Sequence, residues 1–245
     1  MRIFLAGAAG AIGRRLMPLL LGAGHRVTGT TRHAETARML ERAGVSPAVV
    51  DVFDASALTA AVSAARPAVV IHQLTDLPHE LDEAKVRASA AANARIRREG
   101  TRNLIAAAQA AGVHRFIVQS ISFAYAPGGE PHREGDPLDL ADPMRAVTVS
   151  GVVDMERQVL AASGIEGIVL RYGLLYGPGT WYATPARKPS LHVDAAACAA
   201  LLAITRARPG VYNIADEDGV VSIAKARAEL DFDPDFRTNL PAQLA

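Results

Sequence analysis

The sequence predicts an α/β fold built as a doubly wound parallel sheet, with helices covering both faces. Short apolar runs alternate with longer segments of helical periodicity, which is typical of repeated strand–helix–strand units. The runs are almost continuously hydrophobic, as expected for parallel strands that are buried on both faces. We expect strands at residues 3–6, 25–31, 48–51, 68–72, 115–119, 167–172 and 211–214.

The helices are expected between these strands. Apolar residues recur at helical spacing from residue 12 to residue 20. Residues 79–111 form one long Ala- and Arg-rich helical stretch, with a break expected near residue 93 or residue 100. Residues 126–144 are rich in Gly, Pro and Asp, which predicts a surface loop, and its length favours a function at the substrate. Further helices are expected at residues 34–43, 57–65, 147–163, 194–205 and 222–230.

Three glycines follow the first strand at intervals of three residues. Gly7 permits a tight turn, Gly10 lets a pyrophosphate approach the backbone, and Gly13 lets the helix pack against the strand. The amides and the dipole at the N-terminus of the helix would hold the phosphates. A glycine trio alone is weak evidence, but its place between a strand and a helix predicts a dinucleotide site.

The end of the second strand favours NADP over NAD, although NAD stays open. A carboxylate at this point binds the ribose 2′-hydroxyl of NAD, whereas an arginine can pair with the 2′-phosphate of NADP. The chain has Arg32 here and no carboxylate. The alternative is that Arg32 is a solvated residue at a strand end.

Composition restricts the remaining classes of partner. The 245 residues include 26 basic and 25 acidic side chains, so charge predicts neither nucleic acid nor membrane as a partner. Cys198 is the single cysteine, which excludes an internal disulfide or a thiolate zinc cluster, and we predict no metal site. No apolar stretch reaches the length of a membrane span, so we expect a soluble cytoplasmic protein.

Several motifs together resemble the extended short-chain dehydrogenase/reductase family, in its NAD-dependent epimerase/dehydratase branch. They lie at residues 7–13, 50–54, 70–75, 99–104, 170–179, 191–194 and 210–214. The resemblance implies a Rossmann-like dinucleotide-binding domain over residues 1–172, with a small C-terminal substrate lobe over residues 173–245 that is interleaved with it. It implies an NAD(P) site formed by Gly7, Ala9, Gly10, Ala11, Ile12, Gly13, Arg32, Asp51, Val52, Gln73, Leu74, Thr75, Ser120, Tyr172 and Gly173.

The resemblance ends at the family's acid–base pair. Relatives carry Tyr-x-x-x-Lys on the helix after the fifth strand, with an acidic residue four positions beyond the Lys. Aligning Glu156 with that acidic residue puts Thr148 and Val152 at the Tyr and Lys positions, and no Tyr-x-x-x-Lys occurs elsewhere. The Lys normally lowers the tyrosine pKa from ~10 so that a proton can move near neutral pH. We therefore expect a non-standard proton donor. Arg97 also stands where the family has Asn.

The candidates for proton chemistry are hydroxyl groups at the ends of the fifth and sixth strands, namely Ser120, Ser122, Tyr125 and Tyr172. Counting four residues back from Tyr125 gives Ile121, so either neighbouring serine could face the substrate. The tyrosines could equally pack with their hydroxyls hydrogen-bonded. His72, His192 and Asp194 are interpreted as structural. Arg14, Arg15 and the cluster of Arg95, Arg97 and Arg98 are interpreted as solvated helix faces, although one of these arginines could meet a phosphate.

The sequence supports one leading function and two alternatives. We expect an NAD(P)-dependent oxidoreductase acting on a small, mostly apolar molecule, because residues 180–191 are too short to hold a nucleotide-sugar. The loop at 126–144, Trp181 and Tyr182 would bound this substrate. The alternatives are a redox-neutral isomerase, cyclase or lyase that keeps its cofactor unchanged, and a regulatory protein that senses NADP. A homodimer through the helices around 79–111 and 147–163 is also expected.

Overall fold

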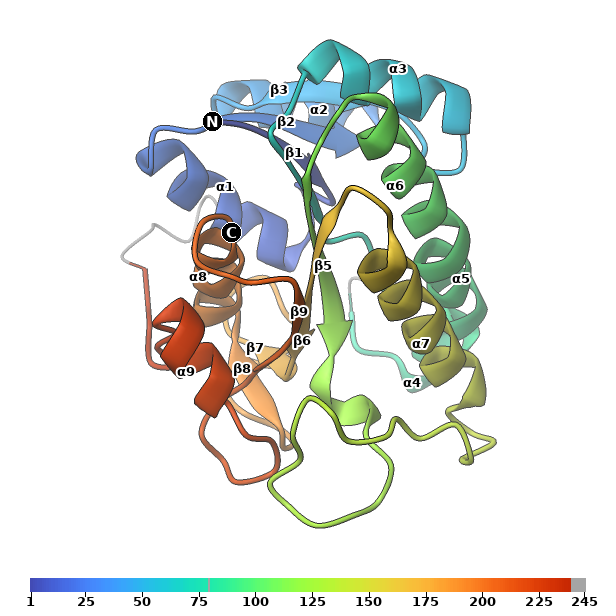
Figure 1. Ribbon diagram of the computed structural model, residues 1–245, viewed down its shortest axis with the longest axis vertical. Helices are drawn as coiled ribbons and strands as arrows, with labels where there is room; N and C mark the ends of the chain where they lie inside the picture. Colours follow the sequence, from blue (N-terminus) through green and yellow to red (C-terminus); the bar gives the residue numbers. More distant parts are fainter. Residues whose placement is uncertain (79, 239–245) are drawn as a thin grey trace.

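The structure, a computed structural model that describes residues 1–78 and 80–238, is organised around a seven-stranded parallel sheet (Figure 1). The strand order is β3-β2-β1-β4-β5-β6-β9, and every neighbouring pair is parallel. The predicted doubly wound α/β fold is confirmed. The strands are β1 (Arg2–Ala6), β2 (Arg26–Thr31), β3 (Ser46–Val49), β4 (Val69–His72), β5 (Arg115–Ile121), β6 (Glu166–Tyr172) and β9 (Gly210–Ile214).

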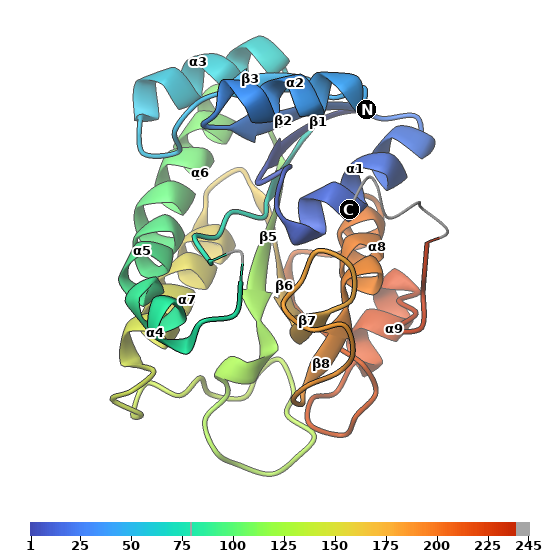
Figure 2. The ribbon, with the colours of Figure 1, turned by 180° about the vertical axis from the view of Figure 1, so that it is seen from behind.

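Helices cover both faces of the sheet, as Figures 1 and 2 show from opposite sides. One layer contains α1, α2 and α8, and the other contains α3, α5, α6 and α7. The helices are α1 (Ala11–Gly22), α2 (Ala34–Arg42), α3 (Ala55–Ala65), α4 (Glu83–Ala88), α5 (Ala90–Arg95), α6 (Thr101–Ala110), α7 (Ala146–Ala161), α8 (Val193–Ala203) and α9 (Ala224–Leu230). A π-helical turn, η1 (Ile96–Gly100), joins α5 to α6, and a 3-10 turn, η2 (Ser122–Ala124), follows β5.

Strand geometry divides the core into two layers. Successive side chains of a strand point to opposite faces, so Ile3 and Leu5 pack with α1 and α8, whereas Phe4 and Ala6 pack with α3 and α6. All four side chains are almost fully buried. The sheet order turns back between β1 and β4, and in such sheets ligands bind outside the carboxyl ends of the strands at this switch point.

Two predicted elements were misplaced. The third strand is Ser46–Val49 and not 48–51, because its bounds follow the pairing with β2, in which Thr28 faces Ser46. The predicted helix at 79–111 includes residue 79, which lies outside the described residues. The rest begins only at Glu83, is interrupted at Ser89, and contains the π-helical turn. Asp82 accounts for the late start, because its carboxylate caps α4 by accepting from the amides of Ala84 and Lys85.

The C-terminal part contains a feature that the sequence did not predict. β7 (Leu174–Tyr176) and β8 (Ser190–His192) form a separate two-stranded parallel sheet. β9 joins the edge of the main sheet beside β6, and α8 packs on α1. Much of the stretch after residue 172 therefore lies within the main sheet and its helical layer.

The two helical stretches that were expected to form a dimer contact pack partly against each other within the chain. A Cβ added to Gly151 of α7 would lie 3.0 Å from the Cα of Ala94 in α5, so these two helices pack closely. The homodimer itself stays a prediction. Over residues 1–78 and 80–238, no helix is long and apolar enough to cross a membrane.

Candidate NAD(P) and substrate site

The glycine loop between β1 and α1 is closed tightly against its surroundings. Gly7 has φ +90°, and a Cβ at this position would lie 2.6 Å from the carbonyl oxygen of Gln73. A Cβ on Gly13 would overlap the carbonyl oxygen of Gly7 and come within 2.5 Å of that of Ala8. Gly10 is the exposed member of the trio, and the nearest atom to an added Cβ is 3.4 Å away. The loop therefore leaves its outer side open to a ligand.

The N-terminus of α1 presents amides at this opening. Gly10 is the N-cap and provides no side-chain cap. The Gly10 amide bonds to the carbonyl of Gly7, and the Arg14 amide bonds back to Gly10. Between them lie Ala11, Ile12 and Gly13, whose first-turn amides have no partner within the helix. Such a terminus binds phosphate, so this cradle fits a dinucleotide.

The residues that were expected to meet the adenosine lie at the ends of β2 and β3. Arg32 follows β2 directly and is exposed, while the Thr30 hydroxyl accepts a hydrogen bond of 3.3 Å from the Gly7 amide. Asp51 lies two residues beyond β3, and its carboxylate accepts a 2.9 Å bond from the Phe53 amide. The Val52 carbonyl accepts a 2.9 Å bond from Asn103. These residues lie at the strand ends where an adenosine is held in this fold class.

The ends of β4 and β6 contain an unsatisfied polar group that points to a ligand. Gln73 is buried, and its amide nitrogen donates a 3.4 Å bond to the Tyr172 hydroxyl. The Gln73 side-chain oxygen has no hydrogen-bond partner among the described residues, and neither has the buried Ser122 hydroxyl. Buried polar atoms are rarely left unpaired, so both fit contact with a bound molecule. Burial raises the pKa of Tyr172, which therefore stays protonated.

The other expected cofactor residues surround this crevice. Leu74 is half-buried and Thr75 is exposed in the loop after β4, and Ala9 lies in the glycine loop, where its carbonyl accepts from Arg14. Gly173 packs against β8, because an added Cβ would lie 2.5 Å from the Ser190 carbonyl oxygen. Gly173 therefore supports the site through close packing.

A buried ion pair connects α7 to β6. The Glu156 carboxylate of α7 accepts two bonds from Arg171 of β6, at 2.6 and 2.9 Å, and a 2.6 Å bond from the Ser120 hydroxyl. Both charged side chains are less than a tenth exposed. Ser120 is thus engaged with Glu156, whereas Ser122 is not engaged with any described residue. The sequence did not single out this pair beyond the position of Glu156.

The Tyr125 hydroxyl is also engaged. It donates a 2.7 Å bond to Asn213 and accepts a 2.8 Å bond from Arg171, while its ring stacks on His132. Burial raises the pKa of Tyr125 even though Arg171 opposes the shift. These contacts favour the structural alternative, and the catalytic role of Tyr125 stays a prediction without support from this geometry.

The wall formed by α7 contains the two positions at which the acid–base pair was expected. Thr148 is half-buried and Val152 is fully buried. Beside them lies Arg97 of η1, whose guanidinium donates a 3.4 Å bond to the Thr148 carbonyl. Arg97 was interpreted as part of a solvated face, which is wrong for this member of the cluster, because it is half-buried and its stem lies against Gly151 of α7. The sequence did contain a sign of this, because Arg97 stands at the position where the family has Asn.

His72 is a neutral structural histidine, as interpreted from the sequence. Its ring bonds to the Thr101 hydroxyl at 3.2 Å and accepts from the Leu74 amide at 3.2 Å. Burial, with a smaller contribution from Arg97, lowers its pKa to about 3. The imidazole therefore carries no charge at neutral pH.

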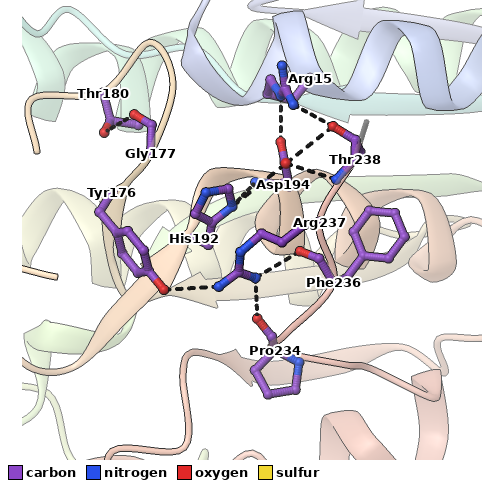
Figure 3. Close-up of polar contacts among 10 residues, drawn as sticks. All are labelled: Arg15, Tyr176, Gly177, Thr180, His192, Asp194, Pro234, Phe236, Arg237 and Thr238. Atoms are coloured by element: carbon purple, nitrogen blue, oxygen red, sulfur yellow. Dashed lines mark hydrogen bonds and ion pairs between the residues drawn. The ribbon is translucent and has the colours of Figure 1, made fainter. Parts of the chain in front are cut away.

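A second polar cluster fastens the C-terminal segment to α1 (Figure 3). Arg15 donates a 2.5 Å bond to Asp194 of α8 and also bonds to the Thr238 hydroxyl. The Asp194 carboxylate accepts from the Thr238 amide at 3.0 Å. Arg15 was expected on a solvated face, which is wrong because α8 covers it and leaves it 3% exposed. His192 and Asp194 do tie down chain segments, as expected.

Asp194 predicts a pH-dependent contribution to stability. Burial disfavours its charge, but Arg15 and the Thr238 amide outweigh burial and lower its pKa. A lowered pKa stabilises the fold above the unfolded-state pKa of ~3.9 and ceases to do so as the pH falls through the folded-state value. We expect D194N to cost about 3 kcal/mol in the free energy of unfolding at pH 7, and progressively less below pH 4. Urea unfolding between pH 7 and pH 3 measures this, with D235N in the same segment as the exposed control. A cost independent of pH would contradict it.

A pocket of about 500 Å³ lies beside the loop that connects β7 to β8 and is lined by Gly177, Pro178, Thr180, Trp181, Ala183 and His192. Trp181 reaches the loop after β4 and donates a 2.8 Å bond to the Pro78 carbonyl. This contact brings the segment between β7 and β8 beside the loop that follows Gln73. Trp181 therefore lies close to the end of β4, which is compatible with the expectation that it bounds the substrate.

Comparisons with known proteins agree with this geometry. Residues 7–199 match a family described as NAD(P)H-binding. Over 240 residues the chain is 42% identical to the 3-diazoavenalumate denitrifying reductase of a Streptomyces species, covering 89% of this chain and 77% of that protein. The fold resembles UDP-glucose 4-epimerase from Thermotoga maritima, with a TM-score of 0.79 at 19% identity over 97% of this chain and 94% of the epimerase chain. UDP-glucose 4-epimerase from Thermus thermophilus, in complex with NAD, gives a TM-score of 0.75 at 20% identity over 100% and 97% of the two chains.

The fold, the glycine cradle and the family match define an NAD(P)-binding domain with a Rossmann-like fold. The chain belongs to the NAD(P)H-binding family. The protein with which it shares 42% identity is named a reductase, and the fold of this chain resembles that of two epimerases.

Proposed function

We propose that the protein is an NADPH-dependent reductase that delivers a hydride to a small diazonium compound and releases dinitrogen. The relative at 42% identity is named for a reductive removal of nitrogen from a diazo compound. The cradle of Gly7, Gly10 and Gly13 would hold the pyrophosphate, and Arg32 would meet the 2′-phosphate. When bound, NADPH supplies the hydride.

The observation that carries this proposal is that the side chains of α7 at the positions of the family's acid–base pair cannot transfer a proton near neutral pH. Thr148 and Val152 occupy the positions expected for the acid–base pair, and the Tyr125 hydroxyl already donates to Asn213. Reduction of a ketone places negative charge on oxygen and needs a proton donor. A diazonium cation that gains a hydride becomes neutral as its C–N bond breaks and N2 departs with the bonding electrons of that bond. This reaction needs no proton donor from the protein.

The direct test follows NADPH and nitrogen together. Purified protein is incubated with NADPH and a 15N-labelled aryl diazonium carboxylate, with NADPH followed by absorbance and 15N2 by mass spectrometry. We expect one NADPH oxidised for each N2 released above the rate without protein. Conversion of the substrate with NADPH unchanged would favour the redox-neutral lyase or isomerase. Tight NADPH binding with no conversion would favour the regulatory alternative.

If Arg32 pairs with the 2′-phosphate, the protein should bind NADPH more tightly than NADH. Removing its guanidinium in R32A is expected to weaken NADPH binding about tenfold, the size of a charge-assisted hydrogen bond, and to leave NADH binding nearly unchanged. Titration of nicotinamide fluorescence measures both affinities. R38A removes another exposed arginine, from α2, and is the matched control. Equal losses for NADPH and NADH would show that Arg32 does not read the 2′-phosphate.

A further inference from the structure

Three arginines lie close together on the helical stretch beside α7, and one of them differs from the others. Arg95 pairs with Glu99 at 2.7 Å, and Arg98 pairs with Asp154 at 2.6 Å, both at the surface. Arg97, between them in sequence, is turned inward. Its side-chain Cδ lies 3.6 Å from where a Cβ on Gly151 would be, so its stem lies against α7.

Arg97 lacks a partner that matches its charge. A guanidinium has five N–H donors, and the hydrogen bond found for this one is the long 3.4 Å contact with the Thr148 carbonyl. No carboxylate among residues 1–78 and 80–238 lies within ion-pair distance of it. Glu156 attracts it electrostatically, but the oxygens of Glu156 already accept from Ser120 and Arg171. Withdrawing a cation partly from water without a counter-ion is costly, and Arg97 is half-buried, which points to a ligand anion.

Arg97 is positively charged, and its uncharged neighbours do not neutralise it. Burial lowers its pKa to about 10, so the guanidinium stays protonated at neutral pH. His72, the neighbouring titratable group on β4, is neutral. Thr148 and Val152, next to it on α7, are uncharged. Arg97 therefore provides a positive charge on the wall where the family carries its Lys.

We propose that Arg97 binds the carboxylate of an aromatic acid and thereby anchors the substrate at the α7 wall. A planar guanidinium pairs with a carboxylate through two parallel hydrogen bonds and is weakly hydrated, which suits a half-buried site. The assignment of this acid as the substrate rests on the proposed function, since the named compound of the 42% identical relative is itself an acid anion. Arg97 is then a specificity-determining residue, because it selects substrates that carry a carboxylate.

The test measures binding and needs no turnover. Isothermal titration calorimetry of the protein with saturating NADP+ uses cinnamate as the anionic aromatic probe and cinnamide as its neutral counterpart. We expect R97M to weaken cinnamate binding about tenfold or more and to leave cinnamide binding unchanged. R97K keeps the charge but loses the planar fork, so its affinity should lie between the two. R98M, on the same turn, is the control and should bind cinnamate like the parent protein.

Two outcomes would overturn the proposal. R97M could bind cinnamate as tightly as the parent protein, or it could weaken NADP+ binding as much as cinnamate binding, which would assign Arg97 to the cofactor. The NADP+ titration of each variant also verifies that it is folded. Arg97-dependent binding of cinnamate in a protein that releases no N2 would refute the proposed function and retain the carboxylate site.

Discussion

Replacing Gly13 with alanine is expected to abolish NADPH binding, whereas the same replacement at Gly22 in the same helix should leave binding intact. An added Cβ at Gly13 would overlap the Gly7 carbonyl and press on that of Ala8, so the loop must open and the first-turn amides of α1 must move. At Gly22 an added Cβ meets nothing within 4 Å. We expect a loss of NADPH affinity of at least about a hundredfold for G13A, because several phosphate contacts are lost together.

Fluorescence titration with NADPH measures this difference, and urea unfolding separates binding from stability. G22A should be equal or slightly more stable, by roughly 0.5–1 kcal/mol, because alanine is the better helix former. Unchanged NADPH affinity in a folded G13A variant would contradict the assignment of the loop as the phosphate cradle.

Breaking the buried pair of Glu156 and Arg171 is expected to have the largest effect on stability. Removing one partner leaves the other charge buried and uncompensated, which costs about 3–5 kcal/mol in the free energy of unfolding. E156L also removes the acceptor of the Ser120 hydroxyl. The double variant E156L/R171M should cost much less than the sum of the two single variants, because it leaves no unpaired charge. Urea unfolding of the four proteins gives this comparison as a double-mutant cycle.

The pair of Arg115 and Glu166 provides the matched control. It also joins an arginine to a carboxylate at 2.6 Å, but the Glu166 side chain is 51% exposed. E166A should therefore cost less than about 1 kcal/mol. Similar costs for E156L and E166A, or additive single variants in the cycle, would show that burial does not make Glu156 exceptional.

The fold was predictable because the central strands carry their own signal. β1 and β4 are buried on both faces, so their apolar runs reveal them whatever surrounds them. β3 is different because it lies at the edge of the sheet, begins with Ser46 and Pro47, and leaves Val49 59% exposed. An edge strand is defined by its pairing partner, and hydrophobicity alone placed it two residues too late.

The phosphate loop was predictable for a similar reason, whereas the α7 side of the site was not. The three glycines follow a strand at regular spacing and precede a helix, so a short stretch of sequence is enough to indicate the loop. Arg97 depends on a π-helical turn, which changes the helical period between residues 96 and 100 and turns another side chain inward. Arg171 and Glu156 meet only after β6 and α7 have packed together. Such contacts arise from tertiary structure, and no spacing in the sequence encodes them.

The contact of Arg15 with Asp194 and Thr238 affects the order in which the protein can be assembled. α1, which holds the phosphate cradle, is synthesised well before the groups that neutralise its buried arginine, because Asp194 and Thr238 lie 179 and 223 residues further along the chain. β9, which covers the edge of β6, also comes late. A nascent chain that ends at residue 172 therefore exposes a strand edge and an unpaired cation, which are covered only after α8, β9 and Thr238 have been made.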